Sequence, residues 1–324
     1  MAVLSALIGV ACSSGNVDLG ERGTSFASGG AGGALEGGGR ANAGGKSDGA
    51  AGGSSTLPSS GGTSVVPASG GAAPTDAGSA ASIDSGSASH ATAGCGVAPL
   101  SSDTSIPVNG MTGSYILDLP TGYDNRRAYP LVMVFRGANV TVAAFRSYLN
   151  LEPVVGPDAI IVTPDCLNGG TTWDVQRDTP LVDALLTHLE TAYCVDASRV
   201  FAVGHSAGGF FVSTLGCMRG TELRGIAPLS AGPPTGPCTG EFAVWISQGN
   251  QDTAFGLMNG RADRDFWVQR NACDASASTP VDPSPCVEYS GCTPGFAVRY
   301  CEYNGDLGLP SFAASGLWEF FKGL

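Results

Sequence analysis

The chain has 324 residues, enough for one large domain with additional segments, and its formal net charge is −12. An acidic surface argues against nucleic acids and anionic membranes as partners, because both repel negative charge. Ten cysteines, none of them spaced C-x-x-C, indicate disulfides rather than a zinc ribbon. We therefore expect a secreted or extracytoplasmic protein with no metal and no cofactor.

Residues 1–12 form an apolar stretch of signal-peptide length, which is too short to span a bilayer. It ends at Cys12, after small residues and before a polar tether, a pattern typical of a bacterial lipoprotein signal. Gly9 stands where that signal usually has leucine. A lipid anchor at Cys12 is one expectation, and an ordinary signal peptide with an unmodified cysteine is the other.

A change of composition divides the chain near residue 94. Residues 1–94 hold 23 of the 49 glycines, and Phe26 is the one aromatic residue between positions 13 and 94. Such a segment cannot bury enough apolar surface to offset its ordering entropy, so 13–94 is predicted to be a disordered linker. Residues 95–324 carry every tryptophan and every tyrosine and are predicted to form one domain.

Within this domain, apolar runs alternate with segments of helical spacing. We expect an antiparallel first strand over 113–120, then strands over 130–135, 159–165, 200–203, 225–230, 242–247 and 296–301. Helices are expected over 181–193, 209–215, 262–273 and 311–324, the last with Ser311 as its N-cap. This order predicts an α/β fold, a largely parallel sheet with helices on both faces and ligands at the carboxyl ends of the strands.

A serine in a G-x-S-x-G motif is the centre of the predicted site. The motif, 204–208, lies between the buried strand 200–203 and the helix 209–215, which is the context of a nucleophile elbow. Its glycines let strand and helix approach without Cβ clashes. A chance match in a glycine-rich chain is the alternative, and the flanking elements argue against it. We predict Ser206 as a nucleophile, with the Ala207 N–H binding the oxyanion.

An elbow serine requires a base and an acid that orients the base, and in this fold the acid follows the serine along the chain. Asp252 follows the expected strand 242–247 and therefore lies in a loop at the carboxyl end of a strand. A turn or capping aspartate is the alternative. The second oxyanion donor is expected from Ala138, in the loop after 130–135, where an ordinary turn is the alternative.

The base is missing from its expected place. The chain has three histidines: His90 in the linker, His188 on a helix before the elbow, and His205 beside the serine, pointing away from the hydroxyl. None follows Asp252, and no residue after the last strand can shuttle a proton near neutral pH as imidazole does. Asp306 is the nearest titratable group there, and an ordinary carboxylate is a poor base toward a serine hydroxyl.

Across nearly its full length the domain resembles the secreted feruloyl esterases and polyhydroxybutyrate-depolymerase-like esterases of the α/β-hydrolase superfamily. The segments that carry the resemblance are SYILDLP (114–120), YCVDASRVFAVGHSAGG (193–209), the Asp252 loop with RDFW (264–267), YSGC (289–292) and GLWEFF (316–321). The resemblance implies an α/β-hydrolase fold, with Ser206 as the nucleophile and Asp252 as the acid of a catalytic triad.

Three family histidines are changed in this chain. The resemblance places the triad histidine, which the family carries in a G-G-H segment, at Leu307. The histidines of two H-G pairs correspond to Arg136 and Gln248. The family's disulfides imply the pairs Cys217–Cys238 and Cys273–Cys292, and less directly Cys95–Cys194; Cys286–Cys301 is then a guess, and Cys166 is left over.

Two hypotheses of different classes follow. The first is a serine carboxylic-ester hydrolase of the feruloyl esterase or polyhydroxybutyrate depolymerase type. It forms an acyl-enzyme with small, polysaccharide-linked or polyester substrates and is impaired because Leu307 replaces the base. The second is a catalytically inactive relative that binds the same ligands or a polysaccharide. In either case we expect a monomer.

Overall fold

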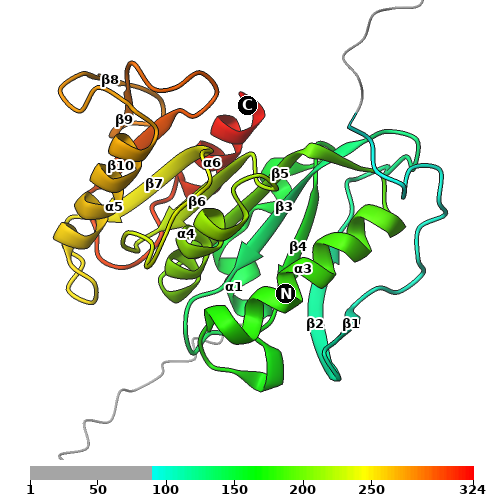
Figure 1. Ribbon diagram of the computed structural model, residues 1–324. Helices are drawn as coiled ribbons and strands as arrows, with labels where there is room; N and C mark the ends of the chain where they lie inside the picture. Colours follow the sequence, from blue (N-terminus) through cyan, green and yellow to red (C-terminus); the bar gives the residue numbers. More distant parts are fainter. Residues whose placement is uncertain (1–89) are drawn as a thin grey trace, which may run out of the picture. The chain divides into compact units, whose positions relative to one another are not determined.

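The computed structural model describes residues 90–324 (Figure 1). The leader 1–12 with Cys12, and nearly all of the predicted linker 13–94, lie outside the described residues. Within the described range, no helix is long and apolar enough to cross a membrane. Ala91 already forms a β-bridge with Asp196, so contacts with the domain begin before Cys95.

One ten-stranded sheet runs through the domain in the order β1-β2-β4-β3-β5-β6-β7-β10-β9-β8. The six strands from β4 to β10 are parallel neighbours, and antiparallel strands extend both edges. The strands are β1 Ser105–Val108, β2 Met111–Asp118, β3 Tyr129–Phe135, β4 Ile160–Pro164, β5 Val195–His205, β6 Gly225–Leu229, β7 Ala243–Gly249, β8 Ser278–Pro280, β9 Cys286–Tyr289 and β10 Val298–Tyr303.

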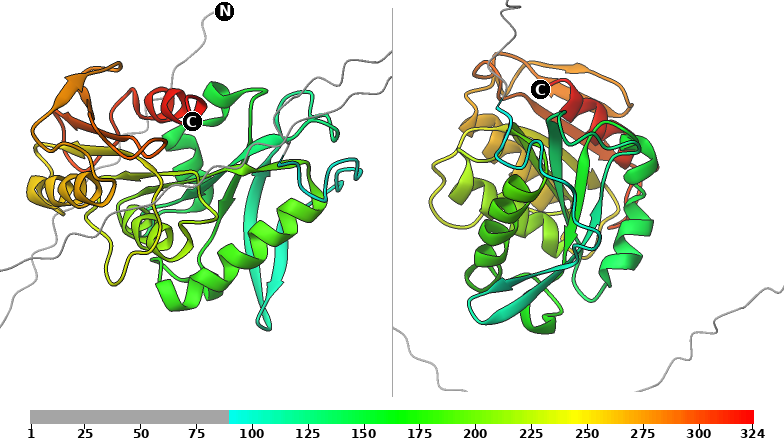
Figure 2. Two further views of the ribbon diagram at one scale, coloured as in Figure 1. Left: turned by 45° about the horizontal axis from the view of Figure 1, so that its top comes forward. Right: turned by 90° about the vertical axis from the view of Figure 1, so that its right-hand side faces the viewer.

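Helices cover both faces of the sheet, as the right-hand view of Figure 2 shows. One face carries α3 Val175–Ala192, α4 Ala207–Arg219 and α5 Leu257–Arg270; the other carries α1 Val142–Leu149, α2 Glu152–Val155 and α6 Ala313–Lys322. Because side chains alternate along a strand, β3 sends Leu131 and Met133 to the first core and Val132 and Val134 to the second. The predicted α/β-hydrolase sheet is confirmed.

The structure differs from the sequence prediction at the ends and in the loops. Ser311 is not the N-cap of α6: the helix begins at Ala313, its N-cap is Phe312, and no side chain caps it. The chain first makes a turn in which the Ala313 N–H donates to Pro310 O at 2.9 Å. The short helix α1 was not predicted; Thr141 caps it by accepting the Ala144 N–H.

Four disulfides connect eight of the described cysteines. Cys95–Cys194, Cys217–Cys238 and Cys273–Cys292 are the pairs that the resemblance implied, and Cys286–Cys301 is the pair that was a guess. Cys166 remains a free, buried thiol within residues 90–324.

We expect thiol titration of the denatured, unreduced chain to find at most two thiols, Cys166 and Cys12. If most of the cysteines were free, that result would contradict the four disulfides, and it would also contradict an oxidising compartment.

Candidate active site

The predicted elbow is formed between β5 and α4. Ser206 has φ 55° and ψ −120°, a backbone conformation that is strained for a non-glycine residue. Its N–H donates to Leu229 O at 2.9 Å, which ties the turn to the neighbouring strand. A Cβ on Gly204 would lie 2.1 Å from Gly208 O, so only glycine allows strand and helix to come this close. The chain thus holds the serine in the conformation that a nucleophile elbow requires.

Asp252 lies in the loop after β7 and is nearly buried. Its Oδ1 accepts the N–H groups of Ala254 and Phe255, and its Oδ2 accepts Gln248 Nε2 at 2.8 Å. Burial raises the pKa of this carboxyl, but the hydrogen bonds from Gln248 and the backbone outweigh burial, so the pKa is lowered from its ordinary value. Asp252 is therefore an ionised carboxylate near neutral pH, and its hydrogen bonds form without a histidine.

Leu307 is half-buried in the loop after β10, beside the loop of Asp252. The two loops are joined directly, because the Gln251 N–H donates to Gly305 O at 2.7 Å. The Leu307 carbonyl in turn accepts His205 Nε2 at 2.7 Å. Three predicted positions, Ser206, Asp252 and Leu307, therefore lie at the carboxyl ends of parallel strands, and an apolar side chain stands where the sequence resemblance places the base.

None of the three histidines is placed as a triad base. His188, on α3, pairs with Asp103 at 2.8 Å, and His90 is exposed at the start of the described chain. His205 packs its ring parallel to Phe145, with 5.9 Å between centroids, and its Nε2 is used by Leu307 O. Burial lowers the pKa of His205, against the opposing effects of the Leu307 carbonyl and Asp252, so its ring is neutral.

The predicted oxyanion loop lies against the serine. A Cβ on Gly137 would be 3.6 Å from Ser206 Cβ, and a Cβ on Gly208 would be 2.2 Å from Phe135 O. The N-terminus of α4, where Ala207 lies, therefore abuts the loop that contains Ala138.

Arg136 has a structural role that the sequence did not indicate. Its buried guanidinium donates to Asp165 Oδ1 and to the carbonyls of Gly137, Gly170 and Thr171. It is thus directed into the loop that follows β4, and it fixes the Gly137 carbonyl, whose peptide carries the Ala138 N–H. The signal that the sequence offered for this contact is that Arg136 and Asp165 directly follow neighbouring parallel strands, β3 and β4.

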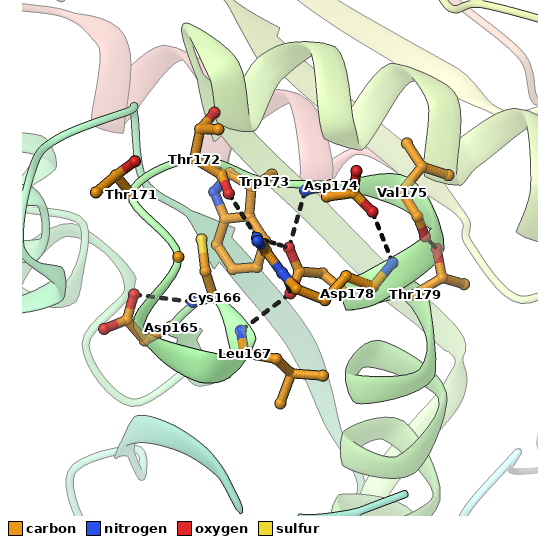
Figure 3. Close-up of polar contacts among 12 residues, drawn as sticks. Asp165, Cys166, Leu167, Thr171, Thr172, Trp173, Asp174, Val175, Asp178 and Thr179 are labelled. Carbon is orange, nitrogen blue, oxygen red and sulfur yellow. Dashed lines mark hydrogen bonds and ion pairs between the residues drawn. The ribbon is translucent and has the colours of Figure 1, made fainter. Parts of the chain in front are cut away.

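The loop after β4 is held at its other end by Asp178 (Figure 3). This buried carboxylate accepts the N–H groups of Leu167 and Asp174 and pairs with Arg177. Trp173 Nε1 donates to Arg136 O at 2.8 Å, which connects the loop to the end of β3. Within residues 90–324, no group of three or more histidine, cysteine, aspartate or glutamate side chains is placed to hold a metal ion.

The mostly parallel sheet, with a serine in a strained turn after a central strand and a buried carboxylate after a later strand, is the architecture of the α/β-hydrolase class. No model of a known protein family matches the sequence. The chain is 30% identical to feruloyl esterase C of Emericella nidulans over 247 residues, which cover 70% of this chain and 90% of that protein. It is 28% identical to feruloyl esterase D of Neurospora crassa over 260 residues, or 71% and 89% of the two chains.

Solved structures agree on the fold. An acetyl xylan esterase from Aspergillus awamori superposes with a TM-score of 0.57 at 12% identity, over 68% of this chain and 99% of that one. Est1E from Butyrivibrio proteoclasticus, solved with ferulic acid, gives a TM-score of 0.50 at 13% identity, over 68% and 98%. The chain belongs to the feruloyl esterase family.

Proposed function

We propose that this protein is a secreted carboxylic-ester hydrolase of the feruloyl esterase type, with Ser206 as nucleophile and Asp252 as acid. Its catalysis is strongly impaired because Leu307 occupies the position of the base. The family relationship and the strained elbow support the reaction class, and the four disulfides support an oxidising compartment. The acyl-enzyme would form slowly, since no group takes the Ser206 proton as the oxygen attacks.

The observation that carries the impairment is Leu307, an apolar side chain in the loop that is joined to the loop of Asp252. In a triad, the acid accepts a hydrogen bond from the histidine and stabilises the imidazolium that forms. Here Gln248 Nε2 and two backbone N–H groups bind this carboxylate, and the neighbouring loop presents a leucine. The oxyanion donors Ala207 and Ala138 are left to supply the residual rate.

The acyl group that we propose is a hydroxycinnamoyl group. Phe210 lies one turn of α4 beyond Ser206, and Phe255 lies three residues beyond Asp252. Their rings are in contact, with 5.0 Å between centroids. The two rings, tilted by 59° to each other, offer an apolar surface to an aromatic acyl group. The relatives from Neurospora crassa and Emericella nidulans are feruloyl esterases by name, in agreement with this choice.

A second function is favoured by Leu307: a site that lacks the base can bind its ligand and not turn it over. In this case the domain would bind hydroxycinnamoyl esters or the polysaccharides that carry them. Binding of ferulate together with a complete lack of Ser206-dependent hydrolysis, also in Leu307→His, would favour this function over the first.

We expect trace hydrolysis of methyl ferulate and of a short p-nitrophenyl ester. Loss of one triad member lowers turnover by on the order of 10⁴ to 10⁶, which leaves on the order of 10³ to 10⁴ over water. Because this residual rate comes from the oxyanion donors and from binding, Ser206→Ala should leave most of it in place, without a change in the circular dichroism spectrum. The serine is tested in Leu307→His: a gain in turnover that persists after Ser206→Ala is added would show that the serine is not the nucleophile and contradict the proposal.

A further inference from the structure

Two buried polar atoms at the interface of β7 and α5 lack a hydrogen-bond partner in the described structure. They are Gln248 Oε1 and Asp263 Oδ2, and both side chains are fully buried. A buried polar atom without a partner costs about 1–3 kcal/mol, so folded proteins rarely keep two of them at one interface. A protonated carboxyl group has an O–H donor, and with it these two oxygens become a donor and an acceptor.

The packing of α5 on β7 places Gln248 against Gly260, one turn of the helix before Asp263. Gly260, Asp263 and Trp267 follow helical spacing on the face of α5 that packs on β7. A Cβ on Gly260 would lie 2.6 Å from Gln248 Oε1, so the amide lies directly against the helix. Asp263 is one turn further along, and helical side chains lean back toward the N-terminus, here toward Gly260.

The other hydrogen bonds of the two side chains do not use Gln248 Oε1 or Asp263 Oδ2, so these two atoms can bind each other. Trp267 Nε1 donates to Asp263 Oδ1 at 2.9 Å, which occupies one carboxyl oxygen. Gln248 Nε2 donates to Asp252 Oδ2 and to Gly249 O at 3.2 Å. Both partners of the amide nitrogen only accept, so the amide cannot be reversed and Oε1 must find a donor.

The surroundings of Asp263 do not support a negative charge. Burial raises the pKa of Asp263 well above its ordinary value, and the hydrogen bond from Trp267 opposes this only in part. No charged side chain contributes to this shift: besides burial, the group that acts on the carboxyl is the Trp267 indole. A neutral carboxyl group at this place costs far less than a buried ion.

We infer that Asp263 is a positioning residue, which donates its Oδ2 proton to Gln248 Oε1 and so holds the amide that binds the Asp252 carboxylate. A chain of hydrogen bonds then runs from Trp267 in the core to the edge of the candidate site. The consequence for catalysis rests on the proposed role of Asp252 as the triad acid. The hydrogen bond to Gln248 does not depend on that role.

The test follows the Gln248 side-chain amide by NMR. The chain has four glutamines, so labelling with ¹⁵N-glutamine gives four side-chain amide pairs, and loss of one in Gln248→Leu assigns the signal. We expect Asp263→Asn to keep this signal and its slow hydrogen exchange, because the asparagine amide can donate to Oε1 while its oxygen accepts from Trp267. Asp263→Leu should speed the exchange about tenfold or more. Asp265→Asn, an exposed neighbour on the same helix, is the matched control.

An unchanged Gln248 amide in a folded Asp263→Leu protein would overturn the inference. If that variant does not fold, wild type and Asp263→Asn are compared as the pH is raised. The wild-type Gln248 signal should then shift as Asp263 loses its proton, and the Asn variant should show no shift; identical behaviour would also overturn the inference. Neither readout requires ester turnover, so a failure of the proposed function leaves this result unaffected.

Discussion

Replacement of Leu307 by histidine is expected to raise the turnover of methyl ferulate by several orders of magnitude, on the order of 10³ to 10⁴. The new imidazole would take the Ser206 proton during attack and return it to the leaving alcohol. Asp252 Oδ2 accepts Gln248 in the present structure, and a carboxylate oxygen has a second lone pair for the imidazole N–H. The measurement is steady-state hydrolysis by Leu307→His beside the unmodified protein.

The loop that carries position 307 is fixed by contacts that do not involve the leucine side chain. His205 Nε2 binds the Leu307 carbonyl, and Asp306 Oδ1 accepts the Gly308 N–H at 2.8 Å. Tyr148 accepts the N–H of the next residue, Leu309. The substitution therefore changes the side chain and leaves the backbone in place. A half-buried leucine also leaves no polar partner behind when it is replaced.

The pH profile of Leu307→His supplies an independent check. Imidazole acts as a base in its neutral form, so the rate should rise with pH through the histidine pKa of about 6.5 and level off above it. Adding Ser206→Ala should abolish the gain. If the unmodified protein already turned over simple esters at ~1–10³ s⁻¹, another group would be the base and the assignment of Leu307 would be wrong.

The central strands and the elbow could be predicted from the sequence because local rules determine them. Runs of β-branched residues such as 200–203 are buried on both faces and can only be central strands. The close approach of Gly204 to Gly208 requires glycine, so the motif identifies the turn. The place of Asp252 follows from the end of β7 for the same reason. These features depend on residues that are near in sequence.

The contacts that shape the site join segments far apart in sequence, and no local pattern reports them. Arg136 follows β3 as an ordinary turn residue would, yet it binds a loop about thirty residues away. Asp263 lies in a polar stretch of α5 and shows its role only through its burial against β7. The edge strands β8 and β9 are short, and β8 is exposed throughout, so they lack the apolar alternation that marks a strand.

The second large effect is expected at Arg136. Arg136→Ala should lower the free energy of unfolding by about 3 kcal/mol, which for a domain of this size is a Tm decrease of roughly 6–12 °C. The side chain of Asp165 is 36% exposed, so solvent screens that ion pair and compensates part of its loss. Most of the cost comes from the carbonyls of Gly170 and Thr171, which lose a charged donor inside the folded loop.

The same variant should also reduce the residual hydrolysis. Arg136 Nη1 holds the Gly137 carbonyl at 3.1 Å, and without it the peptide that carries the Ala138 N–H is free to turn away from Ser206. Thermal unfolding and the ester assay, both in Leu307→His for sensitivity, measure the two effects. Arg126→Ala is the control, because its side chain is 82% exposed and its pair with Asp124 contributes little. Equal Tm values for the two arginine variants would contradict the role of Arg136, and an unchanged rate would show that the Gly137 peptide is held by other contacts.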